Sequence, residues 1–173
     1  MGIKLNQSLG RIVQSISKKE NFSVVTVESV IYKFITNLTK TAETSRRVVI
    51  PGITSIKVIL DLETKEYFVR GRVSPTLKRR LNQLNENGEV ATTLSTRMVI
   101  DISNKIGIPV STVDTILRDF IEELLDEAVN EGRINIPCLT TIRVMQDGTG
   151  DYITRGRVSP ALQSRLKTLD EKV

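Results

Sequence analysis

The hexapeptide RGRVSP occurs twice in this chain, at residues 70–75 and at residues 155–160. The surrounding sequence repeats as well, because Pro51 matches Pro137 at a spacing of 86 residues, and the spacing becomes 85 at the hexapeptide. The chain therefore consists of two copies of one unit of about 85 residues. Two copies with such a long period indicate a pseudo-symmetric pair rather than a solenoid.

The composition excludes most kinds of catalysis. Trp is absent and aromatic residues make up 4% of the chain, so the core must be aliphatic. The chain has no histidine and one cysteine, Cys138, which argues against a zinc site, an internal disulfide and most acid–base chemistry. No nucleophile–base pair or glycine-rich phosphate loop is present. We therefore expect no enzyme activity, metal, cofactor or small-molecule substrate, and we expect Cys138 to be a small buried residue.

Targeting signals and membrane spans are not expected either. The first residues, MGIKLNQS, lack the apolar segment of a secretory signal. No apolar run approaches the length of a membrane span. These features predict a soluble protein without a membrane partner.

Hydrophobic periodicity predicts the same order of elements in both copies, namely two helices, three strands and a closing helix. In the second copy we expect a first helix from Ser95 to Gly107 and a second helix that is capped by Ser111 or Thr112 and ended by Gly132. Strands should follow at 133–136, at 140–144 and from 152, and the closing helix should begin at Pro160. In the first copy we expect helices at 7–19, 24–44 and 75–84, and strands at 47–50, 55–60 and 67–70. The fold class is α+β, with copies at 1–84 and 93–173 joined by a short polar linker at 85–92.

Two stretches of each copy resemble the HU/IHF family of bacterial architectural proteins. One is the corner VVIPGITSI at 48–56, repeated as INIPCLTTI at 134–142. The other is the closing SP-x-L-x-x-x-L pattern at 74–81 and 159–166. Members of this family are intertwined dimers, so the resemblance implies that the two copies form a single-chain pseudo-dimer. The alternative is two independent small domains joined by a linker.

The chain departs from that family at the DNA-binding arms, which in the family are long β-ribbons with an apolar wedge at each tip. The corresponding segments here, 60–66 and 146–151, are tight turns without proline. Both turns are acidic, and their carboxylates are Asp61, Glu63, Glu66, Asp147 and Asp151. Because these charges would repel phosphates, we expect duplex DNA binding to be weak and unspecific.

Basic residues are the remaining candidates for contacts with a partner. The candidates for interface or phosphate contacts are Arg70, Arg72, Arg155, Arg157, Arg46, Arg47, Lys78, Arg79 and Arg80, with Arg143 nearby in sequence. They could contact phosphates, or they could form surface ion pairs with neighbouring elements. Gly71 and Gly156 are expected at a bulge or a close backbone approach.

The charges of the two copies differ. Residues 1–86 hold 15 Lys/Arg against 7 Asp/Glu, whereas residues 87–173 hold 10 against 13. This asymmetry favours assembly through unlike faces, in which the arginines meet an acidic helix of a neighbouring chain. The acidic candidates are Glu122, Glu123, Asp126 and Glu127. A helix-turn-helix interpretation is poor, because the long helix that would have to read DNA is acidic on its exposed face.

Two functions follow as expectations. In the first, the chain is a structural assembly protein whose partners are copies of itself, arranged as a ring, and other virion proteins. It resembles the IHF-like products of virion genes in crAss-like tailed bacteriophages, which implies a ring, neck or tail component located in the virion. In the alternative, it is a histone-like DNA-binding protein of the bacterial cytoplasm or nucleoid.

Overall fold

The computed structural model describes residues 7–82 and 94–172. The expected linker at 85–92 and the predicted end of the preceding helix beyond residue 82 lie outside the described residues. The first repeat comprises α1 (Gln7–Glu20), α2 (Val24–Ser45), β1 (Arg47–Ile50), β2 (Thr54–Leu60), β3 (Tyr67–Val73) and α3 (Pro75–Leu81). The second comprises α4 (Thr96–Ile106), α5 (Val110–Glu131), β4 (Arg133–Ile136), β5 (Thr140–Gln146), β6 (Tyr152–Val158) and α6 (Pro160–Glu171). The predicted order of elements is confirmed in both copies.

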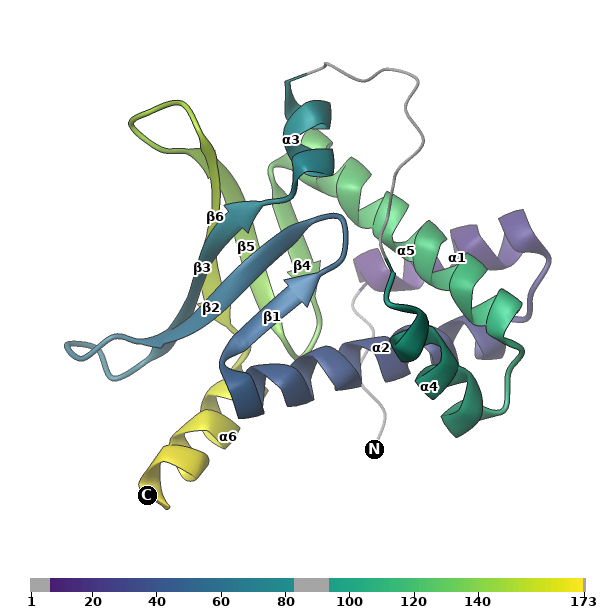
Figure 1. Cartoon of the computed structure of the whole chain (residues 1–173), viewed down its shortest axis with the longest axis horizontal. Helices are drawn as coiled ribbons and strands as arrows, with labels where there is room; N and C mark the ends of the chain where they lie inside the picture. Colours follow the sequence, from purple (N-terminus) through teal and green to yellow (C-terminus); the bar gives the residue numbers. More distant parts are fainter. Residues whose placement is uncertain (1–6, 83–93, 173) are drawn as a thin grey trace.

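The strands of both repeats form one antiparallel sheet of six strands in the order β1-β2-β3-β6-β5-β4 (Figure 1). The last strands of the two repeats pair at its centre, where Arg70 lies directly opposite Arg155. The sheet is therefore shared across a pseudo-twofold axis, and the chain is a single-chain pseudo-dimer. The alternative of two independent domains is wrong. The arrangement is consistent with a tandem HU/IHF-like fold.

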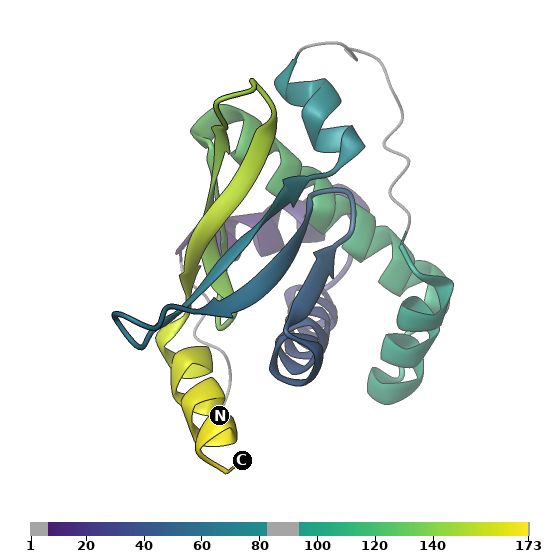
Figure 2. The same ribbon diagram turned by 60° about the vertical axis from the view of Figure 1, so that its left-hand side comes forward.

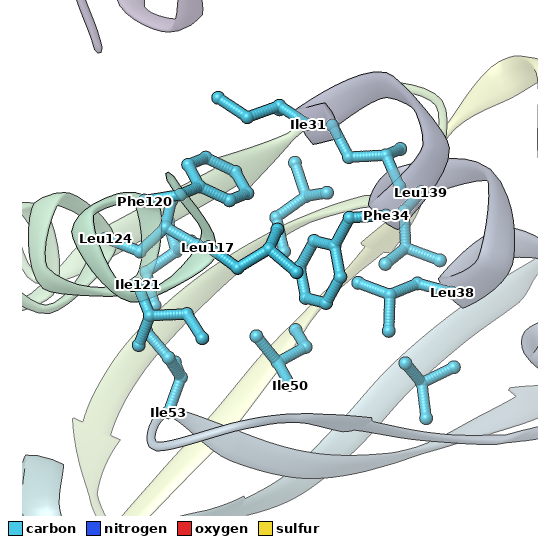
Figure 3. Close-up of a cluster of buried hydrophobic side chains, with 14 of the residues drawn as sticks. Ile31, Phe34, Leu38, Ile50, Ile53, Leu117, Phe120, Ile121, Leu124 and Leu139 are labelled. Carbon is cyan, nitrogen blue, oxygen red and sulfur yellow. The ribbon is translucent and has the colours of Figure 1, made fainter. Parts of the chain in front are cut away.

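The helices form a layer on one face of the curled sheet (Figures 1 and 2). The long helices α2 and α5 contact each other and the edge strands β1 and β4. Their phenylalanines, Phe34 and Phe120, occupy equivalent positions in the two repeats and meet edge to face, with ring centroids 6.0 Å apart (Figure 3). Both side chains are fully buried within one cluster of aliphatic residues drawn from the two copies. The core is thus single and shared.

The closing helices are exchanged between the repeats. Helix α3 of the first copy packs on α5 of the second, and α6 packs on α2. The Arg80 guanidinium donates two hydrogen bonds of 2.9 Å to the Glu122 carboxylate of α5. Its equivalent, Arg165 of α6, donates at 2.9 Å to Glu43 of α2. Each copy is therefore completed by the other.

The third strand of the first copy is longer than predicted. In the first copy we expected it to end near Arg70, but β3 continues to Val73, and in the second copy β6, expected to begin at Tyr152, runs to Val158. The reason is that each strand pairs with neighbours on both sides, so the Arg-Gly-Arg tripeptide lies inside the sheet. The predicted close approach is confirmed, because a Cβ atom on Gly71 or Gly156 would overlap the backbone of the adjacent strand.

Two local expectations in the second copy are wrong. Helix α5 begins at Val110 with Pro109 as its N-cap, and neither Ser111 nor Thr112 caps it, because the extended backbone of Pro109 starts the helix earlier. Cys138 is half-buried rather than buried, and its φ is +65°. It stands where the first copy has Gly52, whose φ is +74°. The same left-handed corner is therefore built with glycine in one copy and cysteine in the other.

Candidate functional site

The sheet has one buried face and one open face. Side chains alternate along each strand, so Ile56 and Ile142 point into the core while Lys57 and Arg143 point away from it. None of the described helices covers the outward face (Figures 1 and 2). This face is where a partner can reach the sheet.

A row of six cations crosses the open face, with one residue on each strand. The register places them directly opposite one another in the order Arg47, Lys57, Arg70, Arg155, Arg143, Arg133. We call this set the cation row. All six side chains are exposed. At about 4.8 Å between neighbouring strands, the row is about 24 Å long.

The cation row has carboxylates near it but no direct ion pair within the described part of the chain. None of its six members forms an ion pair there. Like charges placed directly opposite each other destabilise a sheet, so the arrangement works against folding stability. Six like charges aligned across five successive strand pairs make the cation row a candidate binding surface.

Two further arginines flank the row. Arg72 and Arg157 lie on the same face of β3 and β6, and both are exposed. Phe68 lies directly opposite Arg157, and the guanidinium of Arg155 sits over its ring at 5.8 Å from the centroid. The centre of the open face therefore combines four arginines with one aromatic ring.

The predicted basic residues separate into two groups. Arg47, Arg70, Arg72, Arg155 and Arg157 lie together on the open face. Three of the others form ion pairs between the two repeats: Arg46 with Asp170 at 2.8 Å, Lys78 with Asp151 at 2.8 Å and Arg80 with Glu122 at 2.9 Å. The last, Arg79, is exposed on α3. Surface ion pairing therefore describes Arg46, Lys78 and Arg80, and the first group remains available to a partner.

Sequence reasoning missed two members of the row, Lys57 and Arg133. Lys57 comes one residue after an inward-facing position of β2, and Arg133 is the first residue of β4. Because side chains alternate between the two faces along a strand, both residues lie on the outward face. That signal was present in the sequence. The alignment of all six charges depends on the register between strands, which alternation does not give.

The acidic candidates lie on α5, whose C-terminal end packs on β4, and the charge of Arg133 in the cation row acts on Glu127. Glu122 is held by Arg80, whose guanidinium also lies 3.8 Å from Asp126. Glu123 accepts a hydrogen bond of 3.3 Å from the Ser15 hydroxyl. Burial, and then the charge of Glu131, raises the pKa of Glu127 above its usual value. The helix is acidic, but three of its four candidate carboxylates already have partners within the chain.

The two hairpin turns project at opposite ends of the sheet (Figure 1). Asp61 and Asp147 accept hydrogen bonds within their own turns. Asp61 accepts a hydrogen bond of 2.9 Å from the Glu63 amide. The hydroxyl and amide of Thr149 donate to Asp147, and these bonds, with a smaller contribution from Arg72, lower the pKa of that carboxyl. The turns remain negatively charged and border the cationic face.

Metal binding and membrane insertion were also considered for the described residues. Within residues 7–82 and 94–172, no group of three or more acidic or cysteine side chains is placed to hold a metal ion. None of the described helices is long and apolar enough to cross a membrane.

Compared with known proteins, the chain matches no protein-family model, and no curated protein or solved structure matches it significantly.

Proposed function

We propose that this chain is a non-enzymatic architectural protein that binds duplex DNA weakly, with little sequence specificity, across the open face of its sheet. The observation that supports this proposal is the cation row, in which Arg70 and Arg155 lie at the centre. A partner for six aligned cations without ion pairs must present many negative charges over a similar length. Duplex DNA carries about one charge per 1.7 Å, so about 14 charges lie within 24 Å.

The site is suited to the DNA backbone rather than to base sequence. Guanidinium and ammonium groups on a sheet face contact phosphates, and such contacts position a protein without reading bases. The short turns cannot reach around the duplex as long arms do, and their carboxylates repel it. We therefore expect a dissociation constant of about 10⁻⁴ to 10⁻⁶ M at physiological salt, with little bending.

Charge reversal at the centre of the row should nearly abolish DNA binding. In the double variant Arg70→Glu/Arg155→Glu, two attractive contacts become repulsive, and we expect duplex affinity to fall about a hundredfold, or about 2.8 kcal/mol. Fluorescence anisotropy with a labelled duplex at about 150 mM salt measures this loss. The matched control is Lys18→Glu/Lys40→Glu, which changes two exposed lysines of the helix layer.

The control variant has the same net charge as the row variant, so it should lose less than about threefold if the open face is the binding surface. Equal losses in the two variants would show that net charge alone attracts DNA. In that case the cation row would not be the binding site.

The second candidate is a structural assembly protein of a bacteriophage particle, such as a ring or neck component. It is supported by the acidic turns beside the cationic face, since the turn carrying Glu63 and Glu66 in one molecule could meet the row of the next. Such a heterologous contact closes into a ring if the rotation permits. Sedimentation velocity without DNA separates the two candidates. A closed oligomer at micromolar concentration supports assembly, whereas a monomer supports DNA binding.

A further inference from the structure

The two halves of the open face differ in shape. A hollow of about 750 Å³ lies on the half formed by β4, β5 and β6, and the β2–β3 turn borders it. Arg143 lines it, directly opposite Arg133 on one side and Arg155 on the other. Binding pockets for small molecules have volumes of about 300–1,000 Å³. The hollow is therefore large enough for a nucleotide-sized ligand.

The charges around the hollow define the chemistry of that ligand. Its lining includes the guanidiniums of Arg133, Arg143, Arg155 and Arg157 and the carboxylates of Asp61 and Glu66, which together leave a net charge of +2. A phosphomonoester has a charge of about −1.5 to −2 near neutral pH. A single phosphomonoester would therefore neutralise the hollow.

The placement of the arginines also suits a phosphoryl group. Side chains directly opposite each other on paired strands have Cβ atoms about 4.5–5.5 Å apart, so the guanidiniums of Arg133, Arg143 and Arg155 can converge on one group. Arginine binds phosphate oxygens in bidentate fashion. Phe68 lines the same hollow beside Arg155, whose guanidinium lies over its ring at 5.8 Å from the centroid, so the apolar edge of Phe68 can contact a ring attached to the phosphate.

We propose that this hollow is a phosphomonoester site, in which Arg143 and its two cross-strand neighbours hold the phosphate and Phe68 contacts the attached nucleoside. This site goes beyond duplex binding, because backbone phosphodiesters carry one charge each whereas the hollow matches a terminal phosphate. It also revises the expectation of no small-molecule ligand. The phosphomonoester can come from a free nucleoside monophosphate or from the 5′-phosphate at the end of a DNA strand.

The first test uses adenosine monophosphate, with adenosine as the probe that lacks the phosphate. In ¹H–¹⁵N spectra of the full chain at physiological salt, adenosine monophosphate at millimolar concentration should shift the signals of Arg143, Arg155 and Phe68, and adenosine should not. The second test compares a short duplex bearing 5′-phosphates with the same duplex bearing 5′-hydroxyls. Tighter binding of the phosphorylated duplex assigns the site to DNA ends.

The pseudo-symmetry provides a matched control. Arg143→Ala should weaken adenosine monophosphate binding by about tenfold or more, whereas Lys57→Ala, the equivalent change in the other copy, should change it less than about twofold. Both substitutions should weaken duplex binding to a similar extent. A protein that binds the nucleotide but does not bind duplex DNA would contradict the proposed function and not this site. Glu66→Gln should strengthen nucleotide binding, because it removes a negative charge from the rim.

Two results would overturn the phosphomonoester site. The first is an equal response to adenosine and adenosine monophosphate. The second is no response to the nucleotide together with no preference for the 5′-phosphorylated duplex.

Discussion

Residues 1–86 expressed alone will not form a stable folded monomer. Without the second repeat, β3 loses its pairing with β6 and α3 loses its contact with α5. Phe34, which is fully buried against Phe120, would be exposed to water. Burial of a phenylalanine side chain contributes about 1.5–3 kcal/mol, and the whole stability of a small domain is about 5–15 kcal/mol.

Circular dichroism and sedimentation velocity test this expectation. The fragment should show no cooperative melt as a monomer, and mixing it with residues 87–173 should restore one. A self-associated dimer of the fragment would agree with the intertwined fold, because a second copy can supply the missing partner. A monomer with a sharp melting transition would contradict the shared core.

Adding a methyl group at the centre of the sheet should be strongly destabilising. In Gly71→Ala the new Cβ would overlap the carbonyl group of Ser55, and in Gly156→Ala it would overlap that of Thr141. The obstacle in both cases is backbone rather than a side chain that can rotate away. We expect each substitution to lower the free energy of unfolding by about 3 kcal/mol or more.

Urea denaturation of the full chain measures this loss, and Gly10→Ala is the control. Gly10 lies within α1, and nothing lies within 4 Å of a Cβ atom placed on it. Alanine there should stabilise the protein by about 0.5–1 kcal/mol, because it favours the helix. Normal stability in Gly71→Ala would show that β2 and β3 are not held as close as described.

The sequence predicts the fold well because the repeat and the periodicity are both strong. The matching of Pro51 with Pro137, and of one hexapeptide with the other, defines two equivalent units. The apolar faces of the long helices exceed what three short strands can cover, which favours one shared core. The helix starts at Ser74 and Ser159 follow from local capping chemistry, and both serines accept a hydrogen bond from the amide three residues later.

The candidate site was only partly predictable, because it depends on pairing between distant strands. Arg70 and Arg155 stand out in sequence through the repeated hexapeptide, but nothing local shows that they face each other. Arg133 and Lys57 join them only through the register of β4 with β5 and of β2 with β3. Conversely, Arg80 looks like a surface cation in sequence, and its pairing with Glu122 requires the exchange of α3 between the repeats.

The salt dependence of duplex binding tests the cation row most directly. Each phosphate neutralised on B-DNA contributes about −0.9 to the slope of log K against log salt, so six contacts predict a slope of about −5. Removing the two central charges in Arg70→Ala/Arg155→Ala should reduce its magnitude by about 2. A slope near zero, or one that the double substitution leaves unchanged, would contradict the claim that the cation row binds DNA.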